Sequence, residues 1–317
     1  PRELSAESYE DAIDFAGKNG DIVLIQRAPA WEDFLPDGSV SDDTARATGA
    51  ERDAVKDQHL KLFFAIDPTD GSTGRDRLAG LPGSLAGKRF DDPDVRSAFV
   101  AYAEYIALNY KPAYMALGVE MNLYYEKNKE DFENFESLYR AAYDAVKRKS
   151  PKTQVTLTFQ YEDLLALLPR EDRHFQDWQI IKTFDDVSDF VAISTYPSFV
   201  FDTPDLIPAN YYSQLQAFTS KPIAIAEMGY ASAPGQQGVN SGTEEEQTAF
   251  LRRALDEAGK LSMPFVVWFA IWDPTFARDT AFGAFQSIGL RRDDDAAKAA
   301  WAIWAENALR PYERPDS

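Results

Sequence analysis

The chain has 317 residues, of which 44% are hydrophobic and 13% aromatic, enough for one large α/β domain with a sizeable core. Its formal net charge of −19 argues against nucleic acid or an anionic membrane as a partner, because neither attracts an acidic surface. The absence of cysteine excludes disulfides and thiolate chemistry, and two histidines are too few for a metal site built on several imidazoles. We therefore expect no cofactor and no metal. No apolar segment is long enough to predict insertion into a membrane.

Short apolar segments alternate along the chain with segments of helical period. The predicted strands are 21–26, 61–66, 113–119, 154–159, 189–194, 222–226 and 265–271. The predicted helices include 5–20, 92–110, 129–149, 243–261 and 293–309. In the fourth of these, Thr243 and Glu246 have the spacing of a capping box, which predicts a helix start there.

Buried strands that alternate with helices indicate a parallel sheet. No glycine-rich dinucleotide-binding motif follows the first strand, which favours a (β/α)₈ TIM barrel over a doubly wound sheet. We expect residues 1–317 to form a single catalytic barrel domain. The eighth strand is expected upstream of residue 1, or else within residues 27–60. With an upstream strand, segment 113–119 becomes the fourth barrel strand.

Two glutamates interrupt apolar strand sequence, Glu120 in ALGVEMN and Glu227 in IAIAEMGY. Strand alternation would put Ala116, Gly118 and Glu120 on one face. The strands of the two acids are three apart, so in a barrel both side chains would face the mouth at the carboxyl ends of the strands. Paired carboxylates that flank an acetal are what glycoside hydrolysis requires.

These segments resemble the clan A glycoside hydrolases, which are retaining (β/α)₈ enzymes. LGVEMN resembles their acid/base strand, PIAIAEMGYAS their nucleophile strand, DFVAISTYPS their sixth strand and VVWFAIWD their eighth. SIGLRRDDDAAKAAWAIW resembles the closing stretch of these enzymes. Within the clan, family 113 (β-mannanase-like) and family 53 (β-galactanase-like) are nearest. The chain departs from the pattern at Val119, where most of the clan has asparagine.

The resemblance implies that Glu120 is the acid/base, that Glu227 is the nucleophile and that Tyr196 orients Glu227. It also implies that Trp272 or Trp268 offers a flat face to a sugar ring. Five further residues are predicted to bind substrate from their location alone: Gln160, Tyr161, Arg27, Trp31 and Asp67. Asn122 or Gln160 is the candidate to replace the asparagine that is absent at position 119, which in the clan contacts the sugar 2-hydroxyl.

The function expected is a retaining endo-β-glycanase that acts on a neutral mannan- or galactan-like polysaccharide. Endo action is inferred from aromatic residues in the loops: Trp31, Phe34, Tyr124, Tyr125, Phe199, Phe201, Tyr211 and Tyr212. The partner expected is a polysaccharide or oligosaccharide, and the protein is expected to be a monomer that is secreted, periplasmic or at the cell surface.

Two other classes of function remain open at this point. Asp67, Glu120 and Glu162 follow three successive strands and could hold Mg²⁺ in a metal-dependent barrel lyase or isomerase. No lysine directly follows a strand to act as a base, which counts against that class. A non-catalytic glycan-binding barrel would need the aromatic residues but not both acids.

Overall fold

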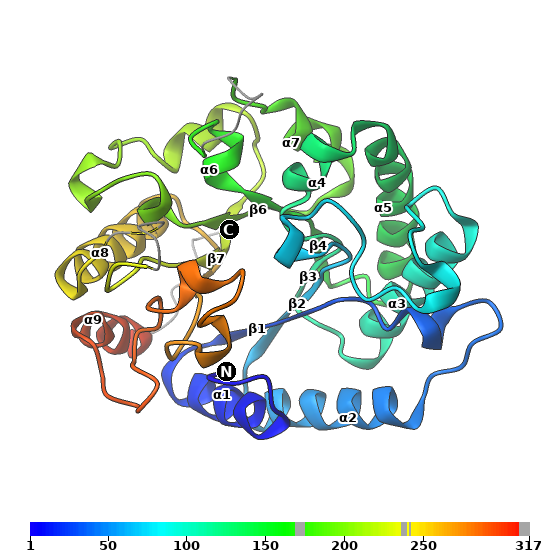
Figure 1. Cartoon of the computed structure of the whole chain (residues 1–317), viewed down its shortest axis with the longest axis horizontal. Helices are drawn as coiled ribbons and strands as arrows, with labels where there is room; N and C mark the ends of the chain where they lie inside the picture. Colours follow the sequence, from blue (N-terminus) through cyan, green and yellow to red (C-terminus); the bar gives the residue numbers. More distant parts are fainter. Residues whose placement is uncertain (169–174, 236–239, 241, 311–317) are drawn as a thin grey trace. The chain divides into compact units, whose positions relative to one another are not determined.

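The computed structural model describes residues 1–168, 175–235, 240 and 242–310 (Figure 1), and the chain divides into two compact units. The β1–β5 unit comprises Ile22–Gln160 and Trp178–Ala192. The β6–β8 unit comprises Pro1–Asp21, Tyr161–Asp177 and Ile193–Ser317. The expectation of one catalytic domain stays a prediction.

A parallel sheet with strand order β1-β2-β3-β4 forms the centre of the β1–β5 unit. Its strands are β1 (Ile22–Arg27), β2 (Lys61–Ile66), β3 (Tyr114–Ala116) and β4 (Gln154–Thr156), and β5 (Thr158–Gln160) follows β4 after one residue. Every residue of β2 except Lys61 is buried, as expected for a parallel strand covered on both faces. The unit therefore has its core along this sheet.

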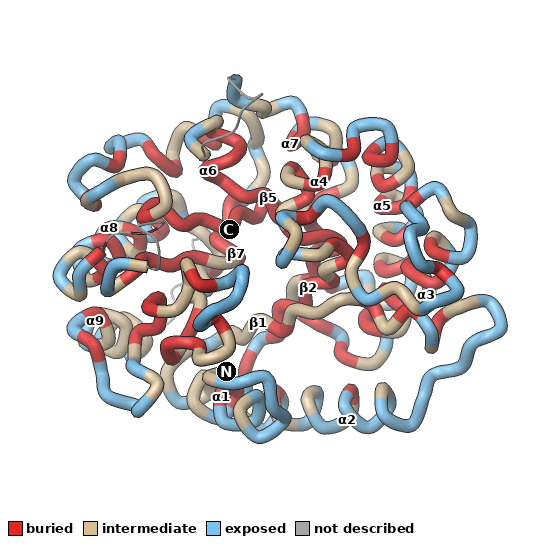
Figure 2. Tube along the Cα trace, viewed as in Figure 1, coloured by how far each residue is buried: buried red, intermediate tan, exposed pale blue. Residues whose placement is uncertain are grey.

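The helices of this unit are α2 (Asp42–Asp57), α3 (Pro93–Asn109), α4 (Met121–Lys127), α5 (Lys129–Lys149) and α7 (Gln179–Thr183). Helix α3 begins where sequence rules place a start, with the Asp92 side chain accepting from the backbone N–H of Asp94 and with proline at the first helical position. Helices α3 and α5 pack together and bury apolar stripes, whereas α2 exposes most of its surface (Figure 2). Arg96 of α3 ties the pair by donating to the Asn134 carbonyl of α5 at 2.8 Å.

The β6–β8 unit contains helices α1 (Ala6–Asn19), α6 (Tyr161–Leu164), α8 (Glu244–Lys260) and α9 (Ala299–Ala308). Its strands are β6 (Val191–Thr195, which begins in the other unit), β7 (Ile223–Met228) and β8 (Val266–Trp268). The capping box is present, because the Thr243 hydroxyl accepts from the Glu246 backbone N–H at 3.2 Å and contacts the Glu246 carboxylate. No helix among the described residues is long and apolar enough to cross a membrane.

All seven predicted strand segments contain β-structure, and segment 154–159 is divided into β4 and β5 at Leu157. Residues 28–60 form the short 3₁₀ helix Trp31–Phe34 and α2 but no strand, so the expectation of an eighth strand there is wrong. A strand upstream of residue 1 stays a prediction.

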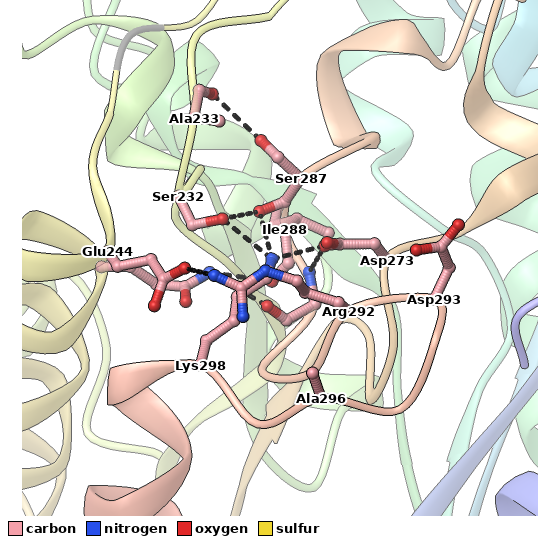
Figure 3. A network of polar contacts seen from close by, with 12 residues as sticks. Ser232, Ala233, Glu244, Asp273, Ser287, Ile288, Arg292, Asp293, Ala296 and Lys298 are labelled. Atoms are coloured by element: carbon pink, nitrogen blue, oxygen red, sulfur yellow. Dashed lines mark hydrogen bonds and ion pairs between the residues drawn. The ribbon is translucent and has the colours of Figure 1, made fainter.

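A buried lysine joins the segments that follow β7 and β8 (Figure 3). Lys298 Nζ donates to Asp273 Oδ1 at 2.6 Å, to Ser232 Oγ at 2.8 Å and to the Ser287 carbonyl at 3.1 Å. These three acceptors match the three N–H donors of an ammonium group. Burial lowers the pKa of Lys298 and raises that of Asp273, and the attraction between the two groups offsets part of each change. We call Lys298, Asp273, Ser232 and Ser287 the Lys298 clamp.

Candidate active site

Glu120 lies in a tight turn beyond β3. After β3 ends at Ala116, Gly118 still accepts from the Thr158 backbone N–H, and a Cβ there would come within 2.6 Å of the Met121 side chain. Glu120 then adopts left-handed backbone angles (φ 49°, ψ 45°) directly before α4. The expectation that strand alternation orients the Glu120 side chain is therefore wrong, because β3 ends at Ala116 and the turn sets the orientation of that side chain. Such a conformation costs about 1–3 kcal/mol and is concentrated at functional sites.

The Glu120 carboxylate is held by an arginine that sequence reasoning missed. Arg75 Nε donates to Glu120 Oε2 at 2.9 Å, and Arg75 Nη1 donates to Asp67 Oδ1 at 2.6 Å and to Thr69 Oγ1 at 3.0 Å. Gln26, from the end of β1, donates to the other oxygen of Asp67. We call Gln26, Asp67, Thr69, Arg75 and Glu120 the Arg75 cluster. It joins groups that lie at or beyond the carboxyl ends of β1, β2 and β3, where parallel α/β folds bind ligands.

The charges of the Arg75 cluster do not balance. Two carboxylates share one guanidinium, so the cluster carries one net negative charge until a proton is taken up. Burial alone would lower the pKa of Arg75, but the two carboxylates raise it above its usual value. Burial raises the pKa of Asp67 even though Arg75 opposes that change. Arg75 is therefore the shared counter-charge of both carboxylates.

The set of acids expected to hold Mg²⁺ does not form one site. Arg75 occupies an oxygen of both Asp67 and Glu120, while Glu162 lies in the β6–β8 unit, where Thr195 and Tyr211 bond it. Over residues 1–168, 175–235, 240 and 242–310, no three histidine, cysteine, aspartate or glutamate side chains are grouped as metal ligands would be. The metal-dependent alternative is not favoured.

Glu227 lies near the carboxyl end of β7, and its carboxylate accepts a hydrogen bond from the Tyr196 hydroxyl. Tyr196 directly follows β6, so the contact joins two neighbouring strand ends. The Tyr196 ring stacks on Phe199 with centroids 5.4 Å apart and meets Phe285 edge-on at 5.0 Å. The expected Tyr196–Glu227 contact is thus present, and the catalytic roles of both residues stay predictions.

The two tryptophans expected to contact a sugar are both buried. Trp268 donates its indole N–H to the Ile288 carbonyl at 2.9 Å, and Trp272 donates to Asp295 at 2.6 Å. By contrast Phe269, which follows β8, is half-buried and lies 5.7 Å edge-on from Phe285. Phe269 is therefore a half-buried aromatic residue directly after β8, and its ring meets the Phe285 ring, which also packs against Tyr196.

The remaining predicted substrate-binding residues have internal partners. Asn122 donates to the Gln160 carbonyl and accepts from the Gln160 backbone N–H, which joins the start of α4 to the end of β5. Tyr161 donates to the Tyr211 carbonyl and Trp31 to the Ala79 carbonyl, both from buried positions. Arg27 forms an ion pair with Glu51 on α2. The substrate contacts of all of these stay predictions, whereas Asp67 lies within the Arg75 cluster.

We expect Arg75→Met to lower the free energy of unfolding by about 3 kcal/mol, because it leaves two mostly buried carboxylates without their shared counter-charge. Arg75→Lys keeps the charge but cannot reproduce two directed contacts, so an intermediate loss is expected. Urea denaturation at neutral pH measures both. Arg77→Met, which breaks an exposed pair with Asp70, serves as the control and should cost less than about 1 kcal/mol. Equal losses for Arg75→Met and Arg77→Met would contradict the clustering.

Comparison with known proteins shows similarity in structure but not in sequence. No protein-family model matches the chain, and no curated protein matches it. A GH5_18 protein from Streptomyces cattleya, solved with Manβ1-4GlcNAc, is 18% identical with a TM-score of 0.73, and the alignment covers 98% of this chain and 78% of that one. A GH5_18 protein from Bifidobacterium longum subsp. infantis is 16% identical with a TM-score of 0.70, covering 98% and 75%.

A third solved structure is the exo-β-1,4-mannosidase Op5Man5 from Opitutaceae bacterium strain TAV5. It is 17% identical with a TM-score of 0.69, and the alignment covers 96% of this chain but only 55% of that longer protein. These neighbours are clan A glycoside hydrolases with TIM-barrel folds. The chain therefore has an α/β fold of the TIM-barrel class, and the predicted fold class is confirmed. The nearer resemblance to families 113 and 53 stays a prediction.

Proposed function

We propose that this protein is a retaining β-glycoside hydrolase that uses Glu227 as the nucleophile and Glu120 as the acid/base. The observation that carries the proposal is the hydrogen bond from Tyr196 to Glu227 at neighbouring strand ends, in a fold shared with β-glycosidases. A hydrogen bond from a neighbouring hydroxyl fixes the orientation of a carboxylate. A carboxylate held in this way is suited to attack the anomeric carbon of a bound sugar.

In the first step Glu227 attacks the anomeric carbon and forms a glycosyl ester, while Glu120 gives its proton to the departing glycosidic oxygen. In the second step Glu120, now ionised, takes a proton from water, and the water oxygen displaces Glu227 from the sugar. The Arg75 cluster supports this cycle, because Arg75 holds the Glu120 carboxylate in place.

We further propose a β-mannosidic linkage as the substrate, with galactan as the second candidate. The support is the solved neighbours, one of which is described as an exo-β-1,4-mannosidase and another of which was solved with Manβ1-4GlcNAc. Internal cleavage of a polysaccharide was expected from aromatic loops, but Trp31, Tyr124, Tyr211 and Tyr212 are buried in the structure. Product size therefore decides between internal and terminal cleavage.

The proposal is tested by incubating the protein with β-mannan, β-1,4-galactan, Manβ1-4GlcNAc and aryl β-glycosides. Chromatography sizes the products, and NMR of the first product reads its anomeric configuration. We expect release of sugar with the β-configuration retained. A first product with the α-configuration would contradict the mechanism, and no release from any β-linked substrate would contradict the function.

Phe269→Ala is expected to raise the KM for the aryl mannoside by about three- to tenfold with little change in kcat, because a lost ring contact removes roughly 1 kcal/mol of binding. Steady-state kinetics measures the change. Trp272→Phe is the matched variant for the residue chosen from sequence. Since Trp272 is buried against Phe15 and bonded to Asp295, we expect this variant to lower thermal stability and leave KM unchanged. The opposite pattern would favour Trp272 as the platform.

A further inference from the structure

Glu162 is a fully buried carboxylate that the proposed chemistry does not use. It belongs to α6, directly after the strand segment that ends at Gln160, and its side chain has no exposure to solvent. An ionised carboxylate in such a place is costly unless several donors surround it. A leucine or methionine of similar volume would fill the same space without that cost. Packing alone therefore does not explain a glutamate at this position.

The donors that surround Glu162 come from two segments of the β6–β8 unit. Thr195 Oγ1, at the end of β6, donates to Glu162 Oε1 at 2.6 Å. The Tyr211 hydroxyl donates to the same oxygen at 2.8 Å. Tyr212 contacts Thr195 at 3.3 Å. The carboxylate therefore joins the end of β6 to the segment around Tyr211.

The bond from Thr195 leads towards the proposed nucleophile. Tyr196, the residue that follows Thr195, donates its side-chain hydroxyl to Glu227. A strand end is the most mobile part of a strand, because the ladder of hydrogen bonds stops there. Holding Thr195 limits where the neighbouring Tyr196 hydroxyl can lie, and hence where the Glu227 carboxylate is held.

We propose that Glu162 is a positioning residue, which holds Thr195 so that the hydroxyl of the adjacent Tyr196 directs the Glu227 carboxylate at the anomeric carbon. This inference rests on the proposed function and deepens it. Burial raises the pKa of Glu162, and the hydrogen bonds from Thr195 and Tyr211 oppose that rise. Replacement by glutamine keeps the size but presents an amide, which is a weaker acceptor than a carboxylate.

The test measures formation of the glycosyl-enzyme separately from its hydrolysis. A 2,4-dinitrophenyl 2-deoxy-2-fluoro-β-mannoside is the probe, because its leaving group needs no protonation and the ester it forms is long-lived. We expect Glu162→Gln to lower the rate of labelling by about 10- to 100-fold, the effect of a displaced reacting group, with the binding constant of the probe little changed. Glu257→Gln, which breaks an ion pair with Arg253 on α8, is the matched control and should label like wild type.

A double-mutant cycle separates positioning from general stabilisation. Tyr196→Phe should slow labelling as Glu162→Gln does, and the double variant should label no more slowly than Tyr196→Phe alone, because both changes remove one chain of contacts. Multiplied losses in the double variant, or labelling of Glu162→Gln at the wild-type rate, would overturn the inference. Glu162→Asp keeps a carboxylate in a shorter side chain and serves as a check on folding. Faster labelling of Glu162→Asp than of Glu162→Gln would support a role for the carboxylate itself. Failure of the wild-type protein to be labelled at Glu227 would instead overturn the proposed function.

Discussion

Glu227→Gln is expected to lower kcat/KM at least about 10⁴-fold, because an amide cannot form the glycosyl ester on which the double displacement depends. The fold should be unaffected, since the amide keeps the size of the side chain and can still accept from Tyr196. Hydrolysis of an aryl β-mannoside measures the loss, and thermal unfolding checks the fold. If the variant loses turnover but still binds an oligosaccharide, binding and catalysis are separate properties. That result would exclude the alternative of a non-catalytic glycan-binding barrel.

Glu120→Gln distinguishes the two proposed roles. Loss of an acid is expected to slow cleavage of natural glycosides by about 10²- to 10⁴-fold. A 2,4-dinitrophenyl glycoside needs no proton in the first step, so its glycosylation step should be much less affected. Azide should then replace water in the second step for Glu120→Ala and yield a β-glycosyl azide. Equal losses with both kinds of leaving group would contradict the assignment of Glu120, and full activity in Glu227→Gln would contradict that of Glu227.

Lys298→Met is expected to lower the free energy of unfolding by about 3–5 kcal/mol, which is the range for removal of one partner from a buried ion pair. The Lys298 side chain is 2% exposed and that of Asp273 is 13% exposed, so water cannot easily replace the lost ammonium group. The Ser232 hydroxyl and the Ser287 carbonyl would also lose a donor. Chemical denaturation followed by tryptophan fluorescence gives the value.

The double variant Lys298→Met, Asp273→Asn removes the uncompensated charge, and we expect it to recover part of the loss. Asp273 Oδ1 also accepts from the Gly289 backbone N–H, a bond that an asparagine oxygen can keep. Arg278→Met breaks the more exposed pair with Asp293 and should cost less than about 1 kcal/mol. A Lys298→Met loss as small as that of Arg278→Met would show that the clamp contributes little to stability.

The α/β pattern could be predicted from the sequence because it depends on local chemistry. The alternation of apolar strands with amphipathic helices predicted all seven strand segments, and the Thr243–Glu246 spacing predicted the start of α8. The position of Glu227 in β7 could also be predicted from the sequence, because a single acid within a run of alanine and isoleucine residues is easily recognised. Periodicity and capping act over a few residues, so the sequence by itself contains them.

The partners of the two glutamates were decided only by the tertiary structure. Arg75 lies 45 residues from Glu120 in the chain, and although the preceding residues DPTDGSTG predict a turn, nothing local marks Arg75 as the partner of that carboxylate. Beside the left-handed Glu120, Gly118 lies so close to Phe135 of α5 that a Cβ would come within 3.0 Å of that ring. The burial of Trp268 and Trp272, and the place of Glu162 between Thr195 and Tyr211, follow from contacts between distant segments. Hydrogen bonds and burial depend on proximity in space, and a single sequence records only proximity along the chain.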